Sequence, residues 1–256
     1  MKLIETHAHI YSEKFEEDVV ECIKRAKGAG VERIYMPNVD SESIDRMLKM
    51  EEDYPNYCIP MMGVHPCSIN ADYKKELAIA EEWFSKRDFV AVGEIGMDLY
   101  WDKTYQNEQE DAFRIQCNWA IEKDIPIIIH SRESTLEILD IIESFSNKKL
   151  RGIFHCFSGT TDEASRIINL GFYIGIGGVV TYKNGGLDKV VPHIPLDKIV
   201  LETDCPYLPP TPHRGKRNET SYLNLIAEKI GDLHQVSVGK VAEITSVNAE
   251  KVFQVK

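Results

Sequence analysis

Two histidines near the start of the chain have the spacing of paired metal ligands. His7 and His9 end the stretch 2–9, which begins with apolar residues and which we expect to be a strand. Because residues two apart on a strand point to the same face, both imidazoles would project side by side. Neutral imidazole is a strong ligand for zinc and similar ions. The pair alone does not distinguish a metal site from ordinary surface or core histidines.

Further ligand-type residues stand at or near the ends of other apolar segments. These residues are His65, Glu94, His130, His155 and Asp204. A polar strand end in solvent is more often Asn, Asp, Ser or Gly than His. If the strands run parallel side by side, their carboxyl ends share one edge, where such side chains would converge. The repetition therefore favours a metal site that several segments build together.

Strands and helices alternate along the chain. Short segments rich in β-branched residues predict strands at 2–9, 31–37, 58–64, 89–94, 125–130, 150–157, 172–176 and 199–204. Helical periodicity is found at 13–27, from 41 on, and at 73–86, 106–123, 133–144, 162–170, 219–230 and 238–253. Eight parallel units in a chain of this size predict an α/β fold, a closed (β/α)8 TIM barrel forming a single domain over residues 1–256. A dinucleotide-binding fold is disfavoured because no GxGxxG follows the first strand.

Each candidate also has an ordinary alternative. His65, before a proline, could pack as a loop histidine, and His130 and His155 could be satisfied core histidines. Glu94 could cap a helix, and Asp204 could be a turn residue. His193 and His234 have no apolar strand before them, so we expect them to be structural or surface residues.

Charge and composition limit the functional classes. The net charge is −11, which argues against strong non-specific binding of nucleic acid. It does not argue against a site that binds a few phosphates through local basic groups. The six cysteines form no CxxC motif, so reduced thiols are expected. No signal peptide and no apolar stretch of about 20 residues is recognisable. We therefore expect a cytoplasmic protein that does not associate with membranes.

Six motifs, in order along the chain, resemble those of a known family. They are 5–9 (ETHAH), 63–66 (GVHP), 93–98 (GEIGMD), 130–132 (HSR), 154–159 (FHCFSG) and 201–206 (LETDCP). The sequence resembles the TatD family of metal-dependent deoxyribonucleases, within the amidohydrolase superfamily, from the first strand to beyond Arg214. The resemblance implies a TIM barrel with two divalent metal ions.

The resemblance also implies roles for particular residues. His7 and His9 would bind one ion, and Glu94, standing where many relatives have a carbamylated lysine, would bridge to a second. His130 and His155 would complete the second site. Asp204 would be both a ligand and the base toward the attacking water, which makes Asp204 and Glu94 the expected catalytic residues. The ligand types leave Zn, Mg, Mn and Co open as the native metal.

The implied activity is metal-dependent removal of nucleotides from single-stranded DNA ends, in the 3′ to 5′ sense, releasing 5′-mononucleotides. We expect His65, Arg132 and Arg214 to bind substrate phosphates, although the basic loop 213–217 could equally be a solvated charge run. Tyr207 and the pair 100–101 could stack on a base or simply pack. No obligate protein partner is implied.

Two rival functions use the same metal site. One is an amidohydrolase or esterase acting on a small molecule, which would need a closed apolar pocket. The other is a metal-binding scaffold without catalysis. The presence of Asp204 argues against the scaffold, because a structural zinc site is closed by its ligands and needs no base.

Overall fold

The computed structural model describes residues 1–145 and 150–254, and its strands follow the predicted order. Within these residues the strands are β1 (Leu3–Glu5), β2 (Val31–Pro37), β3 (Cys58–Met61), β4 (Val92–Asp98), β5 (Ile127–Arg132), β6 (Gly152–Phe154), β7 (Tyr173–Ile176) and β8 (Ile199–Leu201). Every neighbouring pair is parallel, in a three-stranded sheet β1-β2-β3 and a five-stranded sheet β4 to β8.

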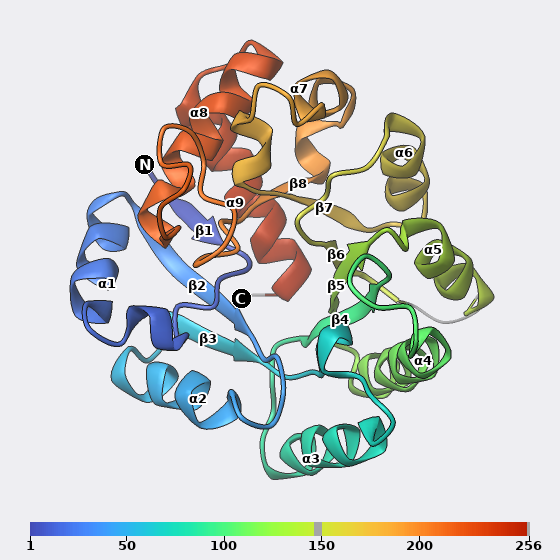
Figure 1. The fold of residues 1–256 in the computed structure, drawn as a ribbon. Helices are drawn as coiled ribbons and strands as arrows, with labels where there is room; N and C mark the ends of the chain where they lie inside the picture. The colour runs from blue at the N-terminus through green and yellow to red at the C-terminus, as the bar shows by residue number, and fades with distance from the viewer. Residues whose placement is uncertain (146–149, 255–256) are drawn as a thin grey trace.

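Hydrogen bonds join the two sheets at both seams. Between β3 and β4, Met62 forms a parallel bridge with Val92, and Gly93 N donates to Met62 O at 3.0 Å. Between β8 and β1, Thr6 N donates to Leu201 O at 3.1 Å. The strands therefore make a ring, and the predicted (β/α)8 barrel is confirmed (Figure 1).

Helices surround the ring, as Figure 1 shows. In the described residues they are α1 (Val19–Gly28), α2 (Ile44–Asp53), α3 (Tyr73–Lys86), α4 (Gln106–Lys123), α5 (Thr135–Ser144), α6 (Thr161–Asn169), α7 (Leu187–Val190), α8 (Leu223–His234) and α9 (Val238–Phe253). Short 3-10 turns are η1 (Glu13–Phe15), η2 (Pro66–Ser68), η3 (Gly178–Thr181), η4 (Val191–His193), η5 (Leu196–Lys198) and η6 (Thr220–Tyr222). None of the described helices is long and apolar enough to cross a membrane.

Several predicted strand boundaries are wrong. The first strand ends at Glu5 rather than His9, since its ladder with β2 ends where Glu5 pairs with Ile34. Beyond it only single backbone hydrogen bonds continue, from Thr6 N to Leu201 O on β8 and from Ala8 N to Tyr35 O on β2. The fourth strand starts and ends later than predicted, since its pairing with β5 continues as far as Asp98 opposite Arg132. Glu94 is therefore an interior residue of β4 and not its last residue.

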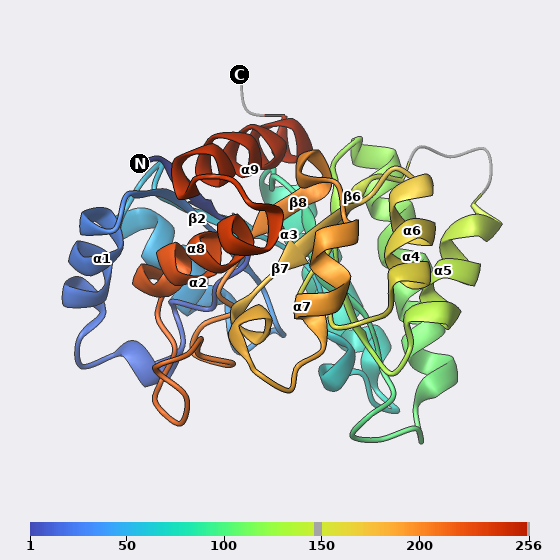
Figure 2. The ribbon, with the colours of Figure 1, turned by 90° about the horizontal axis from the view of Figure 1, so that it is seen from above.

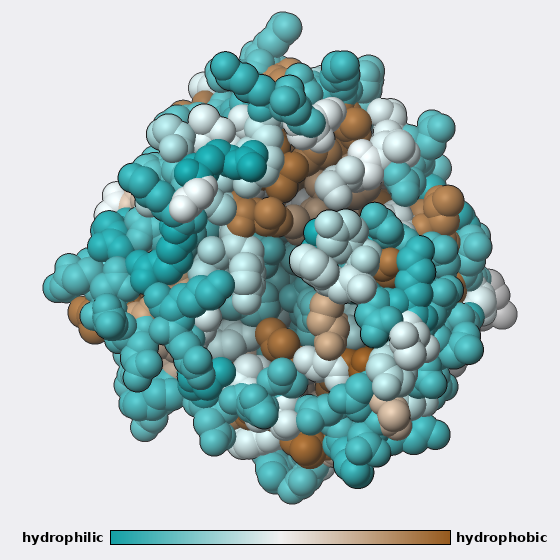
Figure 3. Space-filling view, in the orientation of Figure 1, coloured by the Kyte–Doolittle hydropathy of each residue, from teal (hydrophilic) through white to brown (hydrophobic). Residues whose placement is uncertain are grey.

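Helix α9 closes the amino-terminal end of the barrel. A buried apolar cluster joins this helix to the inward side chains of the strands, and within it the rings of Tyr35 and Phe253 stack with centroids 3.7 Å apart. Figure 2 shows α9 and the amino terminus on one edge of the molecule, with the long loops on the opposite edge. The carboxyl ends of the strands are thus left open, and Figure 3 shows that this face is hollowed near its centre.

Candidate metal centre

The side chain of Glu94 lies at the centre of the histidine cluster and is only 2% exposed. One carboxylate oxygen, Oε2, lies 3.1 Å from Nε2 of His7 and 3.4 Å from Nε2 of His9. These two histidines follow β1, which lies at the seam between β8 and β1. Strand β4, which carries Glu94, lies at the other seam of the ring, next to β3. The two Nε2 atoms are themselves 3.2 Å apart.

The other oxygen of Glu94 faces a second set of histidines. Oε1 lies 2.7 Å from Nε2 of His155, 2.8 Å from Nδ1 of His130 and 3.3 Å from Nε2 of His65. His155 directly follows β6, and His130 lies within β5. Glu94 therefore stands between two groups of ring nitrogens, with one oxygen directed at each.

Asp204 completes the first group. Its Oδ1 lies 3.7 Å from Nε2 of both His7 and His9. The residue adopts a left-handed backbone conformation with φ of 56°, and Asp204 N donates to His7 O at 3.0 Å. That conformation, uncommon for a residue with a Cβ, turns the chain after β8 so that the carboxylate faces the histidines.

The spacing of these donor atoms fits a bound cation. Donors on one tetrahedral ion, each about 2.0–2.1 Å from it, lie about 3.3 Å apart. The three contacts among His7, His9 and Glu94 span 3.1–3.4 Å. Within the described residues, three groups have donor atoms close enough to share an ion: His7 with His9 and Glu94; His7 with His155 and Asp204; and His65 with Glu94 and His130.

The ionisation of the cluster also favours cation binding. Burial alone would raise the pKa of Glu94, but the histidines around it, His155 foremost, hold that pKa well below its ordinary value. Burial lowers the pKa of His7 well below its usual range, which keeps that imidazole neutral with a free lone pair. Burial raises the pKa of Asp204 to about 6, against the opposing effect of His155 and His9. The cluster thus combines an ionised carboxylate with a neutral nitrogen donor at His7. At His155 burial is outweighed by the charge of Glu94, which raises the pKa well above its ordinary value, so a cation would displace a proton there.

Two groups outside the donor cluster orient its histidines. The hydroxyl of Tyr11 donates to Pro37 O at 2.5 Å and lies 2.9 Å from Nδ1 of His9, so it accepts the proton of that nitrogen. Oδ2 of Asp98 lies 2.9 Å from Nε2 of His130. In both cases a hydrogen bond at one ring nitrogen leaves the other free to bind a metal.

Sequence reasoning missed both of these residues, although signals for them exist. Asp98 is four residues after Glu94 on one strand, so both carboxylates share a face. Gly96 lies between them at φ of 139°, where a Cβ would come within 2.0 Å of His130 O, so only glycine allows the two strands to approach here. Tyr11 is two residues after His9, but its partners could not be read from spacing.

Glu5, two residues before His7, contacts backbone groups and not the imidazoles. Its Oε1 accepts the backbone N–H groups of His7, at 3.2 Å, and of Thr203, at 2.8 Å. Glu5 therefore ties together the two segments that carry His7 and Asp204.

The predicted substrate-binding residues lie in different surroundings. His65 lies inside the cluster, within one of the three donor groups. The guanidinium of Arg132 lies 3.9 Å from the ring centroid of Tyr100, and that of Arg214 lies 3.8 Å from that of Tyr182. Both arginines thus contact aromatic rings rather than the cluster.

Within the basic loop 213–217, Arg217 has a structural role. Its two terminal nitrogens each lie 2.7 Å from an oxygen of Asp18, in a forked pair that ties the loop to the start of α1. This arginine is therefore part of an ion pair, and it is neither a free phosphate-binding group nor a member of a solvated charge run.

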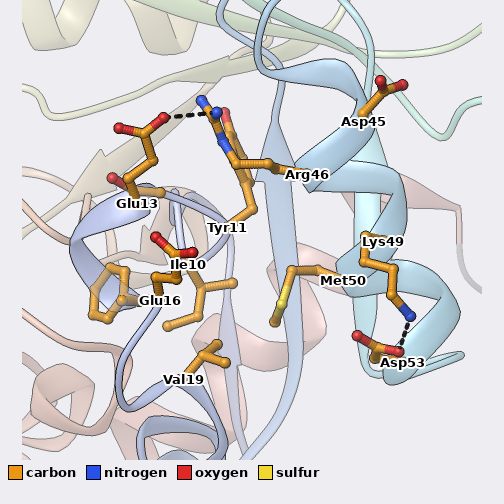
Figure 4. A pocket seen from close by; sticks show the side chains of 12 residues that line it. Ile10, Tyr11, Glu13, Glu16, Val19, Asp45, Arg46, Lys49, Met50 and Asp53 are labelled. Carbon is orange, nitrogen blue, oxygen red and sulfur yellow. Dashed lines mark hydrogen bonds and ion pairs between the residues drawn. The ribbon is translucent and has the colours of Figure 1, made fainter.

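A pocket of about 520 Å³ lies beside the cluster rather than within it. It is formed between the segment after β1 and helix α2, and Tyr11 lines it (Figure 4). Two ion pairs, Glu13 with Arg46 and Lys49 with Asp53, lie at its wall. None of the predicted site residues lines this pocket.

Comparisons with known proteins agree with this geometry. The family model of TatD-related DNases matches residues 4–254. The chain is 39% identical to YabD of Bacillus subtilis, an uncharacterized metal-dependent hydrolase, over 99% of both chains. It is 31% identical to the 3′-5′ ssDNA/RNA exonuclease TatD of Pectobacterium carotovorum, over 96% of this chain and 97% of the relative.

Solved structures show the same likeness. The TatD homolog YjjV of Escherichia coli superposes with a TM-score of 0.93 at 28% identity, covering 99% of this chain and 98% of that one. An N-isopropylammelide isopropylaminohydrolase of Burkholderia multivorans superposes with a TM-score of 0.63 at 13% identity, covering all of this chain and 75% of the other, which shows a shared fold. From the match over nearly its whole length, the chain belongs to the TatD-related DNase family of metal-dependent hydrolases.

Proposed function

We propose that this protein hydrolyses phosphodiester bonds at the ends of single-stranded DNA, in the 3′ to 5′ sense, and releases 5′-mononucleotides. The observation that carries the proposal is the placement of Glu94, whose Oε2 faces His7 and His9 while its Oε1 faces His130 and His155. That arrangement suits a pair of divalent ions acting on one phosphate. The relative from Pectobacterium, named as an exonuclease of this type, supports the same direction.

Two ions are proposed, held by donor sets that share Glu94. The first set is His7, His9, Glu94 and Asp204, and the second is Glu94, His130 and His155. Bound ions would lower the pKa of a water and neutralise charge that develops on the phosphate oxygens. His65 is close enough to Glu94 to be either a further donor to the second set or, as the sequence predicts, a hydrogen-bond donor to phosphate.

Asp204 is the proposed base for the attacking water. Its carboxylate is mostly buried and faces His7 and His9, the nitrogens of the first donor set. Burial raises the pKa of Asp204 to about 6 without a bound ion, and a nearby cation would lower that pKa, so the carboxylate is ionised at neutral pH and can accept a proton. Asp204 therefore has both the position and the basicity to take a proton from a water in the cluster.

Binding of the substrate is assigned to positive groups around the opening. Arg132 and Arg214 would contact phosphates flanking the reacting one, each held against an aromatic ring. Because the overall charge is −11, these local cations would give modest affinity that weakens with salt.

All six cysteines are free thiols in the structure, which supports a cytoplasmic location for this activity.

The test is hydrolysis of a 3′-labelled and a 5′-labelled oligonucleotide in the presence of Mg, Mn, Zn or Co. We expect release of mononucleotides from the 3′ end, abolished by EDTA and reduced at least ~100-fold in Glu94→Gln and Asp204→Asn. Glu228→Gln, an exposed carboxylate on α8, is the matched control. Cleavage that persists with EDTA or in Glu94→Gln would refute the proposal, as would turnover confined to small amides or esters.

A further inference from the structure

Three side chains form an exposed group beside the metal centre, which we call the aromatic platform: Tyr100, Trp101 and Arg132. Tyr100 is 50% exposed and Trp101 is 70% exposed, which is unusual for large aromatic residues. Their rings meet edge to face with centroids 4.8 Å apart. The guanidinium of Arg132 lies 3.9 Å from the first ring centroid and 5.1 Å from the second. The platform thus offers flat surfaces and a positive charge to solvent.

The platform is held in place by the same carboxylate that orients a proposed metal ligand. Oδ1 of Asp98 accepts the backbone N–H groups of Tyr100, at 3.1 Å, and Trp101, at 3.4 Å. Oδ2 of the same side chain lies 2.9 Å from Nε2 of His130. The position of the two aromatic residues is therefore tied to the metal centre through one residue.

The backbone of Arg132, on β5, is bonded to the same end of β4 that carries Asp98. It is paired with Asp98 across β4 and β5, and its carbonyl accepts the N–H of Leu99 at 2.9 Å. Within the described residues Arg132 makes no ion pair with a carboxylate, so its charge is not neutralised by the protein. A guanidinium stacked on an aromatic ring keeps its N–H groups available to an anion at its edge.

We propose that the aromatic platform is a nucleobase subsite, which stacks an unpaired base next to the scissile phosphate while Arg132 contacts the adjoining phosphate. This rests on the proposed function, and it assigns the selection of single strands to these three residues. The faces of a base in a duplex are covered by its neighbours, so only an unstacked base can lie against the rings. Figure 2 shows the loop that follows β4 projecting from the same edge of the molecule as the loop that follows β8.

Binding is tested first, because it does not depend on turnover. A fluorescent oligonucleotide with phosphorothioate linkages at its 3′ end is titrated by anisotropy with the metal-loaded protein and with Trp101→Ala. A second oligonucleotide lacks the last two bases at its 3′ end. Stacking is worth about 1–3 kcal/mol per base, so Trp101→Ala should weaken binding of the complete strand roughly 5- to 150-fold.

The abasic strand should bind equally weakly to both proteins, and Trp101→Phe should restore most of the affinity. Val247→Ala, exposed on α9 at the opposite end of the barrel, is the control and should bind as the unmodified protein does. Equal affinity of Trp101→Ala and unmodified protein for the complete strand would overturn the proposal. A similar loss with the abasic strand would also overturn it, because the ring would then not act through a base.

Hydrolysis separates this inference from the proposed function. An unmodified strand that lacks its last two bases is a phosphodiester with no aromatic ring at the reacting end, so its turnover should be unchanged in Trp101→Ala, whereas KM for an ordinary oligonucleotide should rise with little change in kcat. Lower turnover of the abasic strand would overturn the subsite, since it would show damage to the metal centre. If the unmodified protein binds the strand through Trp101 but hydrolyses no diester, the proposed function fails and the subsite stands.

Discussion

Asp98 and His130 are joined across β4 and β5 by a contact of 2.9 Å between Oδ2 and Nε2. The opposite ring nitrogen, Nδ1, faces Glu94 at 2.8 Å. A carboxylate that accepts the distal N–H of a histidine fixes the tautomer and raises the basicity of the nitrogen that binds metal. This contact makes Asp98 a positioning residue for the proposed second ion.

Replacing Asp98 with alanine should therefore weaken metal binding without unfolding the protein. Loss of such a partner typically lowers metal affinity by about 10- to 100-fold. The measurement is competition with a chelator of known affinity, using Zn or Mn. Asp102→Asn, an exposed aspartate on the loop that follows β4, is the matched control and should bind metal normally. Unchanged affinity in Asp98→Ala would show that His130 is oriented by its packing alone.

Tyr11→Phe tests the corresponding contact at His9. The substitution keeps the buried ring but removes the oxygen that lies 2.9 Å from Nδ1. That nitrogen would lose its acceptor, so the tautomer with a free Nε2 would be less favoured, and metal affinity should fall about 10-fold. Tyr57→Phe is the control, since its buried hydroxyl has no hydrogen-bond partner among the described residues. Equal losses in both variants would point to a packing effect.

The pair between Asp18 and Arg217 should make stability depend on pH at the acid end. Hydrogen bonds from Arg217 lower the pKa of Asp18 from its ordinary value of 3.8 to about 2. A carboxyl whose pKa is depressed in the folded state stabilises it fully above pH 4, and the contribution disappears as pH falls toward 2. Since the Asp18 side chain is 35% exposed, the pair should contribute no more than about 1 kcal/mol.

The experiment compares urea unfolding of the unmodified protein and Asp18→Asn, both with EDTA, from pH 7 to pH 2.5. The variant should be less stable at pH 7, with the difference closing below pH 4 and shrinking in high salt. Asp232→Asn, another exposed aspartate, serves as control. A difference that stays constant over the whole pH range would contradict an electrostatic origin.

Phe253 should be important for stability but not for chemistry. Its ring stacks on Tyr35, 3.7 Å away, and closes the amino-terminal end of the barrel. Phe253→Ala would leave a cavity there and should cost about 3–5 kcal/mol of unfolding free energy. Urea denaturation measures the loss, with the exposed Val247→Ala on the same helix expected within about 0.5 kcal/mol of the unmodified protein. Metal content of the folded variant should stay the same, because the donor cluster is at the other end.

Much of this protein could be predicted from local patterns. Alternating strands and helices indicated the barrel, since eight parallel units have few ways to bury their apolar faces. The chemical types at the strand ends singled out His7, His9, Glu94, His130, His155 and Asp204, and the structure brings all six into one cluster. These residues could be recognised in the sequence because imidazoles and carboxylates rarely follow apolar strands unless they belong to a binding or catalytic site.

The contacts that each donor makes within the cluster were decided by the tertiary structure. Spacing along the chain does not say which oxygen of Glu94 faces which histidine, nor that Asp98 and Tyr11 supply the hydrogen bonds that orient His130 and His9. These contacts join segments that are distant in sequence, and they exist only once the ring has closed and the register of β4 against β5 is set. Residue type and periodicity are local properties, whereas a contact of 2.9 Å between two strands is a property of the whole fold.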